Sequence, residues 1–170
     1  MTKLTVLHYP NPNLRKKAIS VEVIDENIKN LANDMVETMY SEGGIGLAAT
    51  QVDVHKRVVV MDLSENKDDS TVLINPEITT SEGRTEMQEG CLSVPEVYET
   101  IERAESINYC YLTLDGKTVQ KQASGLLAVC VQHEIDHLNG KLIIDYLSPL
   151  KRQRLKKKTK KQDKSRHQVL

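Results

Sequence analysis

The feature that most constrains this chain is a pair of histidines four residues apart, His133 and His137, inside an apolar segment with helical spacing. Residues four apart share one face of a helix, so both imidazoles can reach one metal ion, and Glu134 between them points into the same space. This HExxH pattern is typical of metal-assisted hydrolysis. The alternative is an ordinary histidine pair, solvated or satisfied within the core.

A catalytic metal site of this kind needs a third protein ligand and an open position for water. Helical zinc proteases take that ligand from a Glu or a third His further along the chain. Here Ile143 occupies the place of the third His, no Glu follows Glu134, and the only later histidine, His167, lies in a lysine-rich tail. Both protease patterns fail, so the third ligand is expected upstream.

The three cysteines are the candidates for that ligand. Cys110 lies in an alternating, strand-like run and is interpreted as a small buried residue. Cys130 shares the helix face of the histidines, but one rigid helix is poorly suited to supply three tetrahedral ligands, so it is interpreted as an apolar wall of the site. Cys91 remains, between Gly90 and Pro95, which mark a tight loop where backbone can approach a ligand closely.

Three separated strings of this chain resemble the peptide deformylases, which remove the N-terminal formyl group from nascent bacterial proteins. They are GIGLAATQ at 44–51, EGCLS at 89–93 and QHEIDH at 132–137. Their order and separations match that family, and the similarity extends over residues 4–155. The chain departs from the family pattern at Thr50, where proline is usual, and at Tyr98, where close members often have arginine. Because proline fixes its own φ, Thr50 is expected to loosen the turn before Gln51.

The resemblance implies roles for the site residues. The ligands of one divalent metal ion would be Cys91, His133 and His137. The ion is expected to be Fe(II) in the cell, with Zn, Ni or Co possible in purified protein, and iron beside a thiolate is expected to be sensitive to air. Glu134 would act as general base and acid. The side-chain amide of Gln51 and the backbone N–H of Leu92 would stabilise the oxyanion.

By the same comparison, the segment containing Ile45 and Gly46 pairs with the backbone of the nascent peptide in a strand-like manner, with Gly90 on the opposite wall. An apolar pocket is expected for the methionine side chain. Its lining would be Ile45, Met87, Leu126, Val129 and Cys130. Ordinary core packing is an equally good interpretation for Met87 and Val129. The resemblance also pairs Arg103 with Asp136 in a buried contact that holds the helix.

Length and composition agree with a compact enzyme. The chain has 170 residues and lacks Phe and Trp, so its core is expected to use Leu, Ile, Val, Met and the six Tyr. We expect one domain, with residues 1–150 catalytic and residues 151–170 a basic C-terminal helix of the same domain. Three cysteines without a paired framework fit a reducing compartment. Without a long apolar stretch or a signal-like N-terminus, a cytoplasmic monomer with no membrane partner is expected.

Charge is unevenly distributed along the chain. Residues 151–170 hold ten Lys and Arg against one acid, Asp163, whereas acidic residues outnumber basic ones in the rest. This segment is either a solvated helix ending in a disordered tail or an electrostatic arm for nucleic acid. In the family that the chain resembles, a C-terminal helix docks on the ribosome near the peptide exit, so the ribosome is an expected partner.

The order of expected elements favours an α+β fold with mostly antiparallel sheets around a central metal-binding helix. Helices are expected at 11–16, capped by Asn11, between Asp25 and Gly43, at 125–138 after a Ser124 cap, and from Pro149 onward. Strands are expected at 56–63, 71–78 and 84–88. A hairpin of 105–114 and 117–122 is expected around a type I′ turn at Asp115-Gly116.

Two other kinds of function compete with deformylation. A zinc protease would share the HExxH chemistry but would lack its downstream ligand here. A noncatalytic, metal-stabilised module that binds RNA through the basic tail would need a fourth protein ligand and would have no use for Glu134. Hydrolysis of a formyl group is therefore the activity expected from the sequence.

Overall fold

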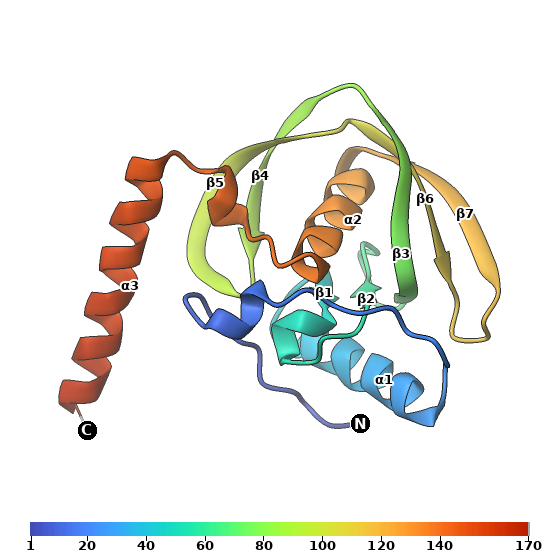
Figure 1. The fold of residues 1–170 in the computed structure, drawn as a ribbon, viewed down its shortest axis with the longest axis horizontal. Helices are drawn as coiled ribbons and strands as arrows, with labels where there is room; N and C mark the ends of the chain where they lie inside the picture. The colour runs from blue at the N-terminus through green and yellow to red at the C-terminus, as the bar shows by residue number, and fades with distance from the viewer. Residues whose placement is uncertain (170) are drawn as a thin grey trace.

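One helix, α2 (Gly125–Leu138), runs between two antiparallel sheets in the computed structural model (Figure 1). The model describes the backbone of residues 1–169 and the side chains of residues 1–159. The five-stranded sheet has the order β1 (Gly46–Ala48), β2 (Val58–Met61), β3 (Thr71–Glu82), β6 (Ser106–Leu112), β7 (Thr118–Ser124). The second sheet is a ribbon of β4 (Thr85–Cys91) and β5 (Val94–Arg103). The α+β class with antiparallel sheets is confirmed.

Two further helices and three short 3₁₀ turns complete the chain. Helix α1 (Glu26–Ser41) packs on β1 and β2, and α3 (Pro149–Val169) stands to one side of the body (Figure 1). The 3₁₀ turns are η1 (Pro12–Arg15), η2 (Ala49–Val52) and η3 (Ile143–Tyr146). Asn11 caps η1 as expected, because its side chain accepts a hydrogen bond of 2.9 Å from the Asn13 N–H.

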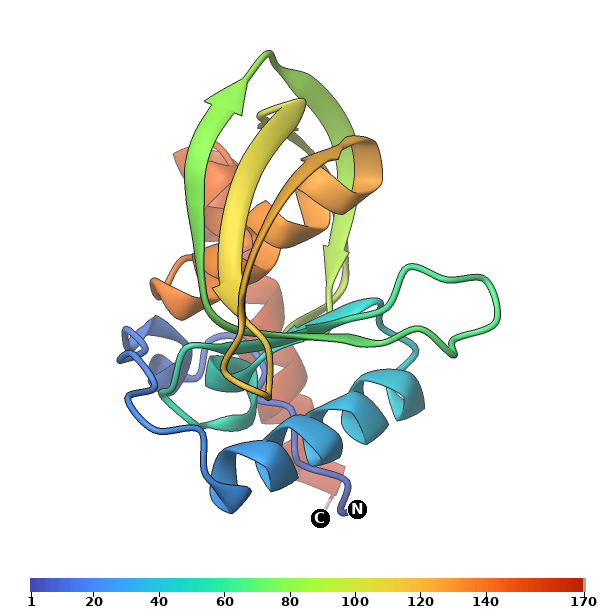
Figure 2. The ribbon, with the colours of Figure 1, turned by 90° about the vertical axis from the view of Figure 1, so that its right-hand side faces the viewer.

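Strand β2 is buried on both faces. Val58 and Val60 belong to the apolar cluster under α1, while Val59 and Met61 belong to the cluster under α2. Figure 2 shows α1 lying along one side of these strands. A strand covered on both faces is expected to be continuously apolar, and the sequence VVVM fits that rule. The sheet therefore forms a rigid layer to which α2 is attached.

The ends of α2 are set by its flanking residues. Ser124 occupies the N-cap position, but its side chain makes no capping hydrogen bond, so the expected cap is absent. The C-terminal stop is confirmed: Gly140 has a φ of +76°, and a Cβ there would collide with the backbone carbonyl of Arg15. Glycine is thus required where the chain leaves the helix.

The turn of the β6–β7 hairpin differs from the expected type I′ turn. That turn needs a positive φ at Asp115, and only Gly116, with a φ of +79°, has one in this loop. The Gly116 N–H donates to the Thr113 carbonyl at 2.9 Å, and the Thr113 N–H donates to the Lys117 carbonyl at 2.9 Å. The connection is therefore a three-residue loop with glycine in the left-handed position.

Strand β5 was not expected from the sequence. It pairs with β4 along most of its length, and β3 and β4 also run further than expected, to Glu82 and Cys91. Only four of the 17 residues of this ribbon are buried, and Pro95 lies near the start of β5. Without a strong apolar alternation, periodicity carries little signal for such strands.

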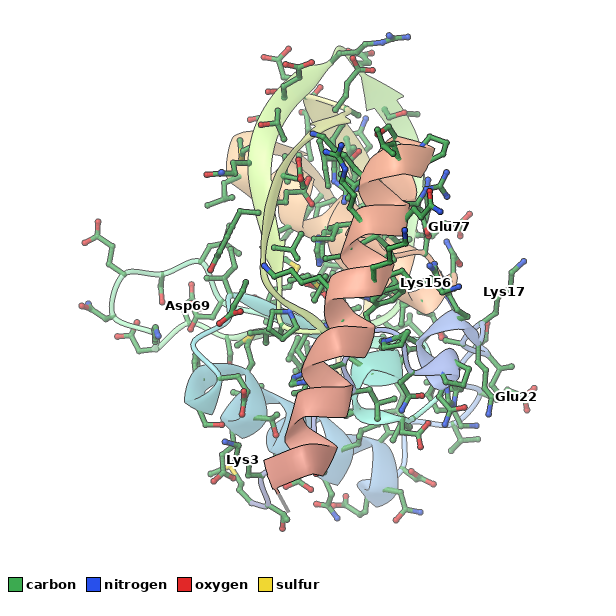
Figure 3. All side chains as sticks on the ribbon, turned by 90° about the vertical axis from the view of Figure 1, so that its left-hand side faces the viewer. Lys3, Lys17, Glu22, Asp69, Glu77 and Lys156 are labelled. Carbon is green, nitrogen blue, oxygen red and sulfur yellow. The ribbon has the colours of Figure 1, made fainter. Side chains whose placement is uncertain are left out.

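Helix α3 touches the body at few points. Leu155 packs against the cluster around η3 and β5. Leu150 is 57% exposed and does not attach the helix to the body. Lys156, labelled on this helix in Figure 3, is exposed, as are Lys157 and Lys158. None of the helices in the described part of the chain is long and apolar enough to cross a membrane.

Because Leu138 is fully buried under the five-stranded sheet, Leu138→Ala should lower the free energy of unfolding by about 2–5 kcal/mol through lost burial and a residual cavity. Leu150→Ala is the matched control, and its exposed side chain predicts a change within about 0.5 kcal/mol. Urea unfolding of both variants measures the difference. Equal losses would contradict the assignment of Leu138 to the core.

Candidate active site

Three potential metal-ligand atoms converge between the end of β4 and the face of α2. The Cys91 Sγ, and one ring nitrogen each of His133 and His137, all lie within 4.8 Å of one another. The two Nε2 atoms are 3.1 Å apart, and Cys91 Sγ is 3.3 Å from His137 Nε2. Tetrahedral ligands bound about 2.0–2.3 Å from a zinc ion lie roughly 3.3–3.6 Å apart. The three donors therefore fit a single divalent ion.

The ring of His133 is oriented by Glu89, a role that the sequence reasoning missed. His133 Nδ1 lies 2.9 Å from Glu89 Oε1, and both side chains are buried. Glu89 precedes Cys91 by two positions on β4, a spacing that places both side chains on the α2 side of the ribbon. The acid two residues before the cysteine of the EGCLS string was therefore the sequence signal from which the role of Glu89 could have been predicted.

Arg103 at the end of β5 holds the Glu89 carboxylate in place. Its Nε and Nη2 donate to the two carboxylate oxygens at 2.7 and 2.8 Å, and its Nη1 donates to Asp136 at 2.8 Å. The expected pairing of Arg103 with Asp136 is confirmed, with Tyr146 as a further partner of both. Burial would raise the pKa of Glu89, but the hydrogen bonds from Arg103 and His133 hold that pKa below its usual value.

The two histidines have opposite pKa shifts. Burial lowers the pKa of His137 well below its usual value, and the neighbouring His133 adds to the effect. Burial acts in the same direction on His133, but its neighbours Cys91 and Glu89 raise the pKa of that imidazole well above its usual value. The protonation of the pair is thus set by neighbouring side chains as well as by burial.

Glu134 lies at the inner end of the site with a free carboxylate oxygen. It is buried, its Oε2 has no hydrogen-bond partner among the described residues, and burial raises its pKa to about 7. Gly46 of β1 makes this packing possible, because a Cβ at that position would lie 2.5 Å from Glu134 Oε1. A carboxylate with a pKa near neutrality is suited to accept and return a proton.

Gln51 and Leu92 both lie next to Cys91. The Gln51 side chain is buried, its Oε1 accepts from the Ala48 N–H at 2.9 Å, and its Nε2 donates to Ser93 Oγ at 3.0 Å. The same Nε2 is 3.8 Å from Cys91 Sγ. Leu92 forms the turn between β4 and β5 and packs beside Gly44, where a Cβ would be 2.7 Å from its side chain.

A cavity of about 570 Å³ opens directly onto these residues. It is lined by every residue expected to contact the substrate, namely Ile45, Gly46, Met87, Gly90, Leu126, Val129 and Cys130. Ile45 and Leu126 are 41% and 50% exposed at its mouth, while Val129 and Cys130 are buried. Gln51, Cys91, Leu92, His133 and Glu134 also line it. The groove thus leads from solvent to Cys91, His133 and Glu134.

The other two cysteines do not join the metal-ligand atoms. Cys110 lies on β6 between β3 and β7, opposite Glu77 and Gln120. Cys130 lines the cavity, and burial raises the pKa of its thiol well above the usual value, which keeps it neutral. The side chain of His167 lies outside the described part of the chain.

Tyr98 stands at the rim of this cavity on β5. A Cβ on Gly90 would lie 2.8 Å from its ring, so glycine at that position leaves room for the aromatic ring beside the groove. Its side chain is otherwise largely exposed, and residues Glu42, Glu96 and Val97 line the same rim, none of which the sequence reasoning had singled out. The rim of the cavity is therefore formed by two segments of the chain, one before β1 and one after Cys91.

Comparisons with known proteins identify the family of this chain. Residues 3–153 match the family model described as polypeptide deformylase. A curated peptide deformylase from Nitrosococcus oceani is 56% identical over 161 residues, which cover 95% of this chain and 96% of the relative. A peptide deformylase structure from Legionella pneumophila is 45% identical, covers 98% of both chains and superposes with a TM-score of 0.91. One from Ehrlichia chaffeensis in complex with actinonin is 40% identical over 95% of this chain and 98% of the other, with a TM-score of 0.91. The chain therefore belongs to the peptide deformylase family, the enzymes that remove the N-terminal formyl group from nascent polypeptides.

Proposed function

We propose that this deformylase holds its metal ion with Cys91, His133 and His137 and uses Glu134 to move the proton. The observation that carries this assignment is the convergence of the three donor atoms within 4.8 Å of one another, beside a buried carboxylate and at the inner end of the cavity. When bound, a divalent ion there would activate water and polarise the formyl oxygen. The remaining steps are performed by side chains and backbone of the chain.

Glu134 would take a proton from the attacking water and later give it to the leaving amine. The water oxygen forms the bond to the formyl carbon, the carbon–nitrogen bond then breaks, and formate leaves beside a free N-terminus. Its raised pKa supports this role, because a carboxylate that titrates near 7 can both accept and release a proton at neutral pH.

Gln51 and Leu92 would stabilise the charge that develops on the formyl oxygen. The Gln51 amide is preorganised by its bonds to Ala48 and Ser93, so little reorganisation is needed when the oxyanion forms. The Leu92 N–H belongs to the turn that directly follows Cys91, which supports its assignment as the second donor.

The methionine side chain would occupy the apolar part of the cavity formed by Met87, Leu126, Val129 and Cys130. Met87 and Val129 line open space rather than only packing with neighbours, which favours the pocket role over ordinary core packing. The backbone at Ile45 and Gly46 would pair with the peptide, since Ile45 lies just before β1 at the exposed mouth, with Gly90 across the groove.

The two competing functions are less well supported. A zinc protease would need a downstream ligand, whereas Cys91 supplies the upstream donor here. A structural metal module would need a fourth protein ligand, and among the described residues three donor atoms converge here. Among the described residues nothing bonds to Glu134 Oε2, and the side chain lines the cavity, which supports a catalytic role over a structural one.

We further propose that the ion is Fe(II) in the cell and that Zn, Ni or Co can replace it in purified protein. One thiolate and two imidazoles form a donor set that accepts each of these metals. We also propose a cytoplasmic monomer in which residues 1–150 form the catalytic domain. The basic segment 151–170 would be the part of that domain that binds the ribosome.

Glu134→Gln tests the catalytic role of this carboxyl group. The substitution keeps the shape but removes the proton acceptor, so formate release from formyl-Met-Ala-Ser by anaerobically purified enzyme should fall roughly 10²- to 10⁴-fold. Bound metal, measured by elemental analysis, should stay at the parent level. Undiminished turnover would exclude Glu134 as the base, and cleavage of unformylated casein by the parent would favour the protease.

Glu89→Gln tests the support of His133 by its buried partner. Loss of the carboxylate charge should weaken metal binding by roughly 10- to 100-fold, as is usual when the partner of a ligating histidine is changed. Competition with a chelator measures this affinity. Glu86→Gln, an exposed glutamate on the same strand, is the control and should bind metal like the parent. Parent-like affinity in Glu89→Gln would show that Glu89 does not orient the ligand.

Neutralising three exposed lysines of α3, with Lys156, Lys157 and Lys158 all changed to Gln, tests the ribosome proposal. Formate release from a short peptide should stay within about twofold of the parent, while ribosome affinity should fall and depend less steeply on salt. Lys17, Lys117 and Lys121 changed to Gln form the matched control on the body. If both triple variants bound ribosomes equally well, α3 would be interpreted as a solvated helix without a role in ribosome binding.

A further inference from the structure

The hydroxyl of Thr50 makes a buried contact with the backbone of a proposed metal ligand. Thr50 is fully buried in η2, and its Oγ1 donates a hydrogen bond of 3.1 Å to the carbonyl oxygen of His137. The same carbonyl accepts from the Gly140 N–H at 3.1 Å, where α2 ends. The threonine thus joins the end of α2 to a segment 87 residues earlier in the chain.

The two histidines are held in different ways, which gives this contact its importance. The ring of His133 is fixed through Nδ1 by Glu89. The Nδ1 of His137 is buried, yet no described side chain or backbone group bonds to it. Apart from the contacts of its Nε2 with Cys91 and His133, the direction of the His137 ring therefore depends on where the helix backbone lies. A hydrogen bond on the His137 carbonyl acts on that backbone directly.

The other end of the contact leads to Gln51. Thr50 is the residue before Gln51 in η2, and the Gln51 amide is fixed by Ala48 and Ser93. One hydroxyl therefore links the segment that carries the proposed oxyanion donor to the helix that carries the proposed ligand. A threonine in place of the usual proline was expected to loosen this turn, and the hydrogen bond to His137 opposes such loosening.

We propose that Thr50 is a positioning residue that sets the place of His137 relative to Gln51. It touches neither the substrate nor the metal, and it acts through the backbone at the end of α2. This inference rests on the proposed roles of His137 as ligand and Gln51 as oxyanion donor. A buried hydroxyl without a hydrogen-bond partner costs free energy, and valine would fill the same volume without that cost. The hydrogen bond to His137 is therefore what a threonine supplies at this position.

Thr50→Val removes the hydroxyl and keeps the shape of the side chain. The variant should release metal to a chelator about five- to tenfold faster than the parent, as expected for the loss of one hydrogen bond, and kcat should fall by a similar factor. KM for a formyl-Met peptide should stay within about twofold, because the groove residues are untouched. Thr50→Ser, which keeps the hydroxyl, should restore both quantities to within about twofold.

Thr38→Val is the matched control. Thr38 is as fully buried as Thr50, and its hydroxyl also donates to a backbone carbonyl, that of Asp34 at 2.7 Å within α1. The same hydroxyl accepts from the Leu4 N–H at 2.8 Å, and neither partner belongs to the site. This substitution should lower the melting temperature without changing metal release or kcat. If Thr50→Val behaved in this way, Thr50 would be only a structural residue and the proposal would be overturned.

Two further variants keep the proposal testable. If Thr50→Val does not fold, Thr50→Ala and Thr50→Ser still differ by a single hydroxyl, and equal metal release and kcat in this pair would overturn the proposal. His137→Ala separates the inference from the assignment on which it rests. If His137→Ala binds metal like the parent, the ligand assignment fails; if it loses metal while Thr50→Val does not, only the role of Thr50 fails.

Discussion

The active site depends on a buried arginine that holds three elements together. Arg103 at the end of β5 bonds Glu89 of β4 through two oxygens and Asp136 of α2 through one. A buried ion pair adds little net stability, but removing one partner leaves an uncompensated charge that costs about 3–5 kcal/mol. The network therefore fixes geometry more than it adds stability. Through Glu89 it sets the ring of His133, and through Asp136 it fixes the helix that carries both histidines.

A second constraint is the close approach of β1 to α2. Gly46 leaves no room for a side chain beside Glu134 Oε1 and Cys130 Sγ, so the backbone of β1 forms one wall of the cavity. Strand β2 holds β1 in place and is itself packed between α1 and α2. The carboxyl group is thereby kept out of bulk water. Its pKa of about 7 follows from that exclusion, because burial disfavours the charged form.

The sequence predicts the centre of this protein better than its edges. Local spacing and glycine are enough to predict three features: the helix with His133 and His137, the glycine that ends it, and the α+β class. The cavity lining, including Met87 and Leu126, came from the family resemblance. Strand β5, the β6–β7 turn and Glu89 were missed, because each depends on partners distant in the sequence or on a backbone conformation that residue types leave open. The contact of Thr50 with His137, 87 residues away, is of the same kind.

The weak attachment of α3 separates its basic surface from the chemistry of the site. Its apolar contact is Leu155, and Lys151 adds an exposed ion pair of 3.3 Å with Glu99, which contributes little in water. Lys156, Lys157 and Lys158 are exposed beyond Leu155, so their charge is available to a polyanion. The ligand and cavity residues are instead held by the Arg103 network and the sheet. The apolar cluster that receives Leu155 also packs against Cys91, so this cluster is where α3 meets the site.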